Sequence, residues 1–209
     1  YAGVSNSGTI TQINNAGLID GLYAMINEGT IGSLANSGTI TSEGSGLVNY
    51  GTINTLTNSG TIKGDTYTGI YSADGTIGSM TNELGGTVSG STNGIYNTAT
   101  VTLLTNAGTI SGNRNGIYNN DGTISKITNS GEIQGTGDAG IYNFRGTLGD
   151  ISNLGASAKI TGGTAGIYSR AATAGSVTNE GTIQGGSYGI YASGTMGNIT
   201  NSGLIDGGY

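Results

Sequence analysis

Residues 116–135 read "GIYNNDGTISKITNSGEIQG", one of nine near-copies that together make up the chain of 209 residues. In each copy, short runs alternate apolar and polar residues and are separated by Gly, Asn and Asp, which is typical of short strands joined by turns. The runs are too short for helices and lack a 3.6-residue apolar period. Self-similarity along the whole chain predicts a repeat architecture.

When the copies are aligned, they show four columns of aliphatic side chains. In the quoted copy the members of these columns are Ile117, Ile124, Ile127 and Ile133. Copies are spaced by 21 to 26 residues, and 35 of the 36 column positions carry a large aliphatic side chain, with Ala174 as the exception. So few residues cannot close a β-sandwich, but they can wind one coil that lies on the previous coil. The sequence therefore predicts an all-β parallel β-helix, or solenoid, of about nine rungs with the columns inside.

A polar column supports this prediction, because Asn stands two residues after the third aliphatic column in every copy. This main asparagine ladder consists of Asn15, Asn36, Asn58, Asn82, Asn106, Asn129, Asn153, Asn179 and Asn201. An amide both donates and accepts, so stacked Asn side chains can satisfy one another when they are buried. A shorter asparagine ladder is expected from Asn6, Asn27, Asn49, Asn97, Asn119 and Asn143. Ligand binding is the alternative use of these amides.

Two outward columns are also expected, because neighbours of inward residues in a strand point to the opposite face. Thr precedes the second aliphatic column in all nine copies, from Thr9 to Thr195, which suits β-propensity and Thr–Thr stacking. An ice-binding face would need a second threonine rank, which the sequence lacks. The other column follows the first aliphatic column and is called the tyrosine line. It comprises Tyr71, Tyr96, Tyr118, Tyr142, Tyr168 and Tyr191, continued by Val48 and Ile26.

Two explanations of the tyrosine line remain open from the sequence. Ring stacking between neighbouring coils would stabilise the rod by about 0.2–1 kcal/mol per pair. Alternatively, contiguous apolar area on a surface marks a contact face for sugars or for a second copy.

Residues that carry chemistry are scarce. The chain has no His and no Cys, so it offers neither a Ser/His/Asp triad nor thiolate metal ligands, and no calcium-binding nonapeptide occurs. The glycine-rich run at 135–140 is not followed by Lys and is not a phosphate loop. The net charge of −6 disfavours nucleic acid, and no apolar run is long enough to insert in a membrane. We expect no enzyme activity, no cofactor and no metal.

The runs "LTNSGTI" at 56–62, "LTNAGTI" at 104–110 and "ITNSGLI" at 199–205 resemble the passenger regions of type V autotransporter adhesins of Gram-negative bacteria. The resemblance covers the whole chain. It implies a right-handed helix, anchoring to the outer membrane through another part of the parent chain, and display outside the cell. It also implies adhesion, autoaggregation or a role as a stalk, and it offers no catalytic residues.

The expected function is therefore that of a non-catalytic adhesin or stalk segment. Residues 1–209 are expected to form a single β-helix segment, a fragment of a longer repeat protein. Its partners are expected to be itself, through rod-to-rod contacts, or host and surface glycans or proteins. Two alternatives stay open: a filament module that stacks end to end, and a carbohydrate-binding module that uses the tyrosine line.

Overall fold

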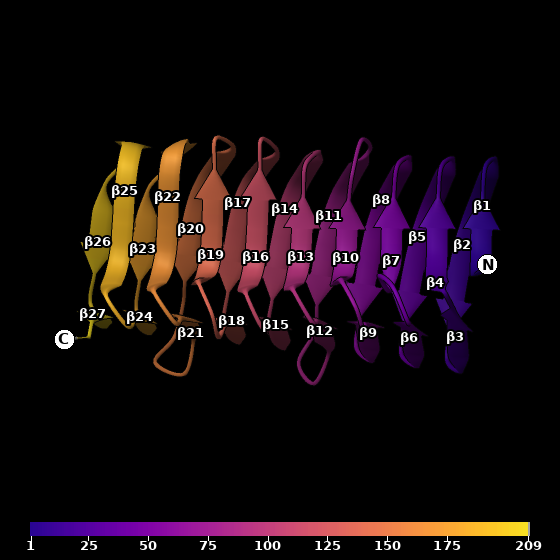
Figure 1. The fold of residues 1–209 in the computed structure, drawn as a ribbon, viewed down its shortest axis with the longest axis horizontal. Helices are drawn as coiled ribbons and strands as arrows, with labels where there is room; N and C mark the ends of the chain where they lie inside the picture. Colours follow the sequence, from indigo (N-terminus) through magenta and orange to yellow (C-terminus); the bar gives the residue numbers. More distant parts are fainter. Residues whose placement is uncertain (209) are drawn as a thin grey trace.

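The computed structural model describes residues 1–208, and within them the chain is all-β, with 27 strands and no helix. Three strands make one coil, and nine coils stack into a single straight rod with the two ends of the chain at opposite ends (Figure 1). All pairings between neighbouring coils are parallel, apart from one isolated antiparallel bridge. The predicted parallel β-helix is confirmed.

The strands of each coil differ in length and fall into three stacks. The first strands are β1 (Ala2–Asn6), β4 (Tyr23–Asn27), β7 (Leu47–Asn49), β10 (Thr68–Ser72), β13 (Asn93–Asn97), β16 (Asn115–Asn120), β19 (Ala139–Phe144), β22 (Ala165–Ala174) and β25 (Tyr188–Met196). The second strands are β2 (Thr9–Asn15), β5 (Thr30–Asn36), β8 (Thr52–Asn58), β11 (Thr76–Asn82), β14 (Thr100–Asn106), β17 (Thr123–Asn129), β20 (Thr147–Asn153), β23 (Val177–Asn179) and β26 (Ile199–Asn201). The third strands are β3 (Leu18–Gly21), β6 (Thr39–Ser42), β9 (Thr61–Gly64), β12 (Thr87–Gly90), β15 (Thr109–Gly112), β18 (Glu132–Gly135), β21 (Lys159–Gly162), β24 (Thr182–Gly185) and β27 (Leu204–Gly207).

The register between coils places like residues on like residues. Between β16 and β19, for example, Ile117 pairs with Ile141 and Tyr118 with Tyr142. The third strands form a nine-stranded sheet, and the first and second strands together form the other, eighteen-stranded sheet. A column of the sequence is therefore a physical stack along the rod.

The four aliphatic columns fill the interior, as predicted. All their members in the seven inner coils are buried, and those of the first and last coils are partly buried, except Ile199, which is 51% exposed. In the first seven coils the second and third columns lie on one strand, and in the last two coils they lie on two. In β17, Ile124 and Ile127 both point inward, while Ser125 and Lys126 between them are exposed. The alternation of inward and outward side chains is therefore interrupted in the middle of this strand.

The main asparagine ladder runs along the inside of one corner, where each second strand ends. At every step Nδ2 of one Asn donates to Oδ1 of the next, over 2.7 or 2.8 Å, from Asn15 to Asn201. The same Nδ2 also reaches main-chain oxygens, as Asn129 does with Gly131 and Lys159, both at 3.1 Å. The ladder satisfies amides that would be costly to bury alone.

The shorter asparagine ladder lies at the end of the first strands and is broken twice. Ser72 and Ser169 occupy ladder positions, and their buried hydroxyl oxygens have no hydrogen-bond partner within residues 1–208. Nδ2 of Asn49 therefore donates only to main-chain oxygens, among them Gly51 O at 2.9 Å. Asn97 then resumes the ladder by donating to Asn119 at 2.7 Å.

The corner between third and first strands is narrow because glycine allows a close approach of main chains. A Cβ atom on Gly116 would lie 2.7 Å from the carbonyl oxygen of Gly140 and 2.8 Å from Cγ2 of Ile133, so only glycine fits. The turn residues that precede each first strand are thereby held beside it.

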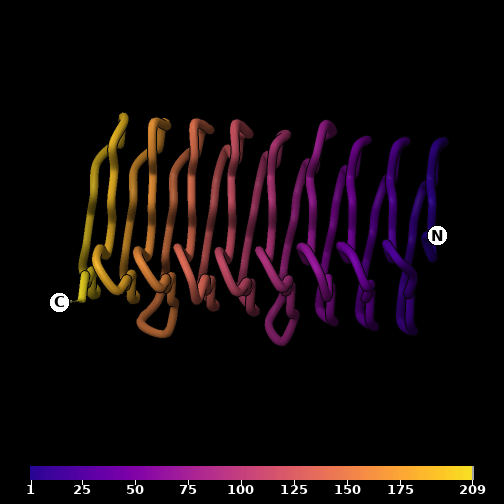
Figure 2. Tube along the Cα trace, in the orientation of Figure 1, coloured from indigo at the N-terminus to yellow at the C-terminus, as the bar shows by residue number. Residues whose placement is uncertain are grey.

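Two longer turns leave the rod on one side, between β11 and β12 and between β20 and β21 (Figure 2). Residues 83–86 and 154–158 form these loops, and a glycine with positive φ, Gly85 in one and Gly155 in the other, turns each chain. Leu84 is 85% exposed and Leu154 is 36% exposed. Apolar side chains thus stand at two projecting points of the surface.

The break at Ser72 can be repaired. Residues 71–76 read "YSADGT" and residues 118–123 read "YNNDGT". The corner at Ser72 therefore has the same length as the corner at Asn119, where an asparagine fits. In the S72N variant, Asn49 and the new amide each gain an acceptor, and we expect the free energy of unfolding to rise by about 1–2 kcal/mol. Denaturant unfolding measures this change.

The control for this experiment is S125N on the exposed face of β17, which we expect to change the free energy of unfolding by less than about 0.5 kcal/mol. A destabilised S72N variant would show that the corner is too tightly packed for an amide.

Candidate binding groove

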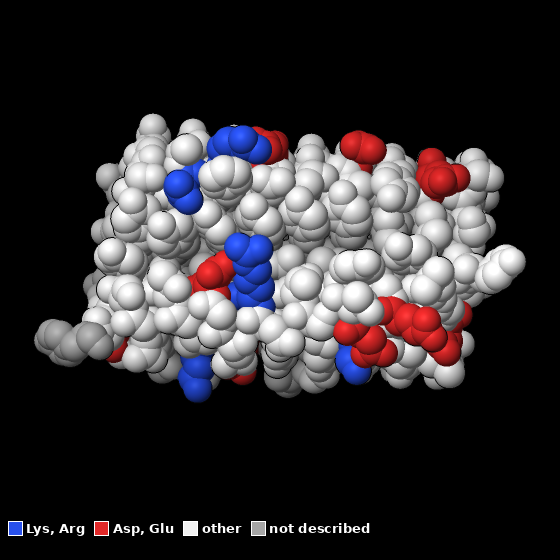
Figure 3. Space-filling model, viewed as in Figure 1, with Lys and Arg blue, Asp and Glu red and all other residues white. Residues whose placement is uncertain are grey.

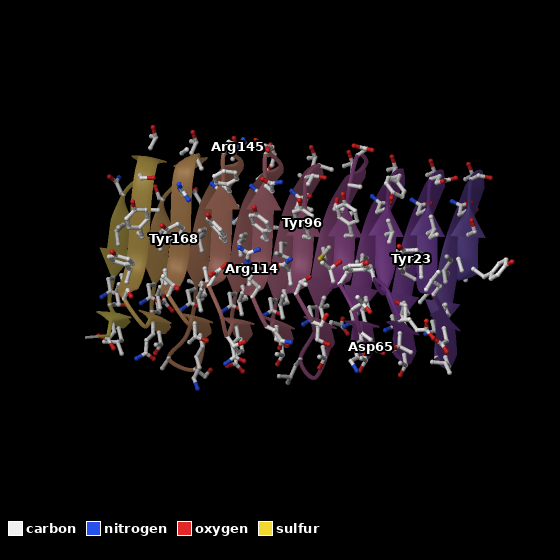
Figure 4. The ribbon with its side chains drawn as sticks, viewed as in Figure 1. Tyr23, Asp65, Tyr96, Arg114, Arg145 and Tyr168 are labelled. Carbon is white, nitrogen blue, oxygen red and sulfur yellow. The ribbon has the colours of Figure 1, made fainter. Side chains whose placement is uncertain are left out.

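The tyrosine line lies on the outer face of the first strands, one residue after the inward aliphatic column. Figure 4 shows Tyr96 and Tyr168 on the same face of the rod as Tyr23 and Arg114. All six side chains are half-buried rather than fully exposed. The prediction that they form one continuous outward column is confirmed, but the column is recessed.

The rings stack on one another along most of the line. Tyr71, Tyr96, Tyr118 and Tyr142 follow at centroid distances of 5.1 Å with interplanar angles of 6°, 12° and 19°. Because neighbours cover the ring faces within this stack, it presents mainly ring edges and hydroxyl groups to solvent. One hydroxyl is fixed by Asn120, whose Nδ2 donates to Tyr96 Oη at 3.0 Å.

The stack is interrupted between β19 and β22. Tyr142 and Tyr168 keep the 5.1 Å centroid distance, but their planes stand at 84°. Phe144 lies 6.2 Å from Tyr142, and the guanidinium groups of Arg145 and Arg170 lie 4.5 and 5.9 Å from the Phe144 ring. The parallel stack resumes between Tyr168 and Tyr191 at 4.5 Å.

A groove with a volume of about 540 Å³ runs along the N-terminal half of the tyrosine line. Its lining comprises Tyr23, Ile26, Ser45, Val48, Tyr50, Tyr67, Thr68, Tyr71, Thr92, Asn93, Tyr96, Arg114 and Tyr118. Turn residues such as Tyr67 and Arg114, which precede the first strands, form one rim. Tyr50 stands at the other corner, 6.5 Å from Tyr71 and edge-on to it.

Val48 differs from the sequence prediction, which placed it on an exposed stripe. It points outward from β7 but is only 4% exposed, because the larger tyrosine side chains around it cover it. Val48 occupies the position next to Tyr71 in the line, so no tyrosine stacks on that face of Tyr71. Beside Tyr71 the groove is therefore lined by Val48 and Tyr50 and not by a stacked ring.

A second, smaller hollow of about 200 Å³ lies where the stack is interrupted. It is lined by Arg114, Asp138, Ala139, Tyr142, Thr164 and Tyr168. Arg114 Nε and Asp138 Oδ2 are 2.7 Å apart, and both side chains are substantially exposed. Arg114 lines both hollows, so the two are adjacent along the rod.

The electrostatics of this face are mild. Figure 3 shows a mostly uncharged surface with basic and acidic side chains side by side near its centre and acidic groups along the lower edge of the N-terminal coils. Burial is the main cause that raises the pKa of Tyr71 and of Tyr118, and the neighbouring tyrosines raise it further. The hydrogen bond to Asp138 raises the pKa of Arg114. Tyr71 and Tyr118 are therefore neutral at physiological pH.

Within residues 1–208 there is no group of three or more acidic, His or Cys side chains that could hold a metal ion, and no helix that could cross a membrane. The threonine column stays on the outer face of the second strands, partly or fully exposed. The asparagines of both ladders point inward and bond to one another, which leaves them no role as ligands.

Sequence reasoning identified the tyrosine line but missed the groove. The rims come from residues that lie three or four positions before or two positions after the line in different coils, and they share no motif. The recurrence of Tyr at 23, 50 and 67, outside the line, was the available signal.

Comparison with protein-family models, with curated proteins and with solved structures gives no match for this chain.

The raised pKa values give a testable pH dependence. Folding favours the neutral phenols of Tyr71 and Tyr118, so their contribution to stability is fully present below the ordinary tyrosine pKa of about 10 and is lost as the pH rises through the raised values. We expect the melting temperature to fall above about pH 10, and a Y71F/Y118F variant to show a smaller fall.

Circular dichroism melts at each pH measure this difference, and phenolate absorbance reports the ionisation. Y67F changes an exposed tyrosine and serves as the control. If the melting temperature above pH 10 falls equally in the native protein and in the Y71F/Y118F variant, the two buried phenols are not the cause of the fall.

Proposed function

We propose that this chain is a non-catalytic segment of a bacterial cell-surface adhesin and that its groove binds a linear glycan. The observation that carries the proposal is the recessed, tyrosine-lined groove along an otherwise regular rod. Continuous in-register pairing makes the rod a rigid scaffold, which holds the groove at a fixed geometry.

The recess favours a narrow ligand over a second rod. The tyrosine rings are half-buried between rims formed by Tyr67 and Arg114 on one side and Tyr50 on the other. A single extended chain can lie in it along the rod axis.

The composition of the groove favours a sugar over a wholly apolar chain. Sugar rings have apolar C–H faces and a rim of hydroxyl groups, and they need both aromatic surface and hydrogen-bonding groups. The lining combines the rings and hydroxyl groups of several tyrosines, Tyr71 among them, with the polar side chains of Thr68, Thr92 and Asn93. The low charge of this face suits a neutral chain.

Removal of the Tyr71 ring tests the proposal. We expect Y71A to weaken glycan binding about tenfold or more, which corresponds to about 1.4 kcal/mol, because the apolar contact with the sugar face is lost. Y71F keeps the ring and should bind nearly as well as the native chain. Binding is measured on immobilised linear oligosaccharides of glucose, galactose, mannose and N-acetylglucosamine.

Y188A is the matched control, since Tyr188 is 45% exposed and lines neither hollow. If the native chain binds none of these glycans, or if Y71A and Y188A bind equally well, the proposal is wrong.

Association between copies is a second candidate function, favoured by the exposed Leu84 and Leu154 on the two projecting loops. Exposed apolar side chains on projecting loops offer contact points between rods that lie side by side. Such contacts would give the autoaggregation expected from the resemblance.

We expect the mass of the native chain in light scattering to rise with concentration, and that of an L84S/L154S variant to rise less. L22S, at a leucine that is 50% exposed but outside the loops, is the control. Association through these loops would be excluded if the native chain stays monomeric, or if the L84S/L154S and L22S variants associate equally.

A further inference from the structure

We propose that the smaller hollow, where the tyrosine stack is interrupted, is an anchoring subsite that holds one pyranose ring of the glycan by a pair of adjacent hydroxyl groups. The proposal rests on the proposed glycan-binding function and adds the chemistry of recognition. The residues involved are Arg114, Asp138, Tyr142, Thr164 and Tyr168.

The interrupted stack provides the surface for the sugar ring. Tyr142 is covered by Tyr118 on one side at 19°, but on its other side it meets Tyr168 at 84°. Two rings at a right angle form a corner whose walls are an aromatic face and an aromatic edge. The apolar face of a pyranose ring can rest in such a corner, whereas the parallel stack from Tyr71 to Tyr142 offers no equivalent place.

The ion pair provides the polar contacts. Arg114 donates from Nε to Asp138 Oδ2 at 2.7 Å, and no other side-chain hydrogen bond within residues 1–208 uses the remaining guanidinium N–H groups or Asp138 Oδ1. A donor and an acceptor therefore stand side by side at one wall of the hollow. Adjacent sugar hydroxyls match this arrangement, because one can accept from the guanidinium while the next donates to the carboxylate.

The position of the pair is fixed by the main chain. Asp138 N donates to Arg114 O at 2.8 Å, and Thr164 N donates to Asp138 O at 2.7 Å. The turns of three consecutive coils are thereby joined, and each contributes one polar residue to the hollow. The side chains of Arg114 and Asp138 remain 65% and 41% exposed, so a ligand can reach them, and a pair this exposed contributes little to folding.

The distance to the main groove fits one oligosaccharide that occupies both hollows. Tyr71 and Tyr142 are three coils apart, which is about 14 Å at the spacing of paired strands. Arg114 lies between the two hollows and lines both. A chain of several sugar residues would meet the Tyr71 ring face at one end and the Arg114–Asp138 pair at the other.

The test measures binding of linear oligosaccharides of two to six residues, taken from the series that the native chain binds, by titration calorimetry. We expect D138N to weaken binding of the longer oligomers at least tenfold, because an amide replaces the charged acceptor. Analogues in which one hydroxyl of the terminal residue is replaced by hydrogen should bind the native chain more weakly. In D138N the same replacement should reduce the binding affinity much less, because the hydroxyl group has already lost the carboxylate that accepts its hydrogen bond.

D121N is the matched control. Asp121 forms the other Arg–Asp pair of these coils, with Arg145 at 2.7 Å, but it lies at the opposite corner and lines neither hollow. Its φ of 57° is a conformation that asparagine also tolerates, so D121N should fold normally. Circular dichroism melts of both variants check folding.

The outcomes separate the two proposals. Native-like binding by D138N together with weakened binding by Y71A would overturn the anchoring subsite and leave the proposed function in place. Equal losses in D138N and D121N would also overturn it. Absence of binding by the native chain would overturn both proposals.

Discussion

In-register stacking of identical residues between parallel coils is the constraint on which the rest of the structure depends. It is most strict in the main asparagine ladder, where a buried amide accepts a hydrogen bond from the Asn of one neighbouring coil and donates one to the Asn of the other. A shift by one residue would move the aliphatic columns outward and leave these amides unpaired. The ladder therefore selects one register, and every other column follows from it.

The groove is a consequence of the same register. Residues one position after the inward column must stack outside, so tyrosines repeated at that position form a line of rings with centroids about one coil apart. Glycine at positions such as Gly116 keeps the corner narrow and holds the preceding turn beside the strand as a rim. A rigid recess thus arises from local repetition without long loops.

Departures from the repeat coincide with the features that distinguish one part of the rod from another. Val48 in place of a tyrosine ends the ring stack at Tyr71, and the smaller hollow lies where the ring angle changes after Tyr142. The two longer turns carry Leu84 and Leu154 away from the rod. The repeats supply the scaffold, and the irregular positions supply the surfaces on which the proposed contacts depend.

The sequence by itself determined the parallel β-helix, its nine coils, the inward aliphatic columns, both asparagine ladders and the outward tyrosine line, because a periodic fold turns each column into a stack. Even the breaks at Ser72 and Ser169 can be read from it. Only the tertiary structure decided that the line is recessed, that Val48 is covered, and that Arg114 of one turn meets Asp138 of the next beside Tyr142. These features depend on the rotamers of large side chains and on turns of unequal length in successive coils, and neither follows from the repeat.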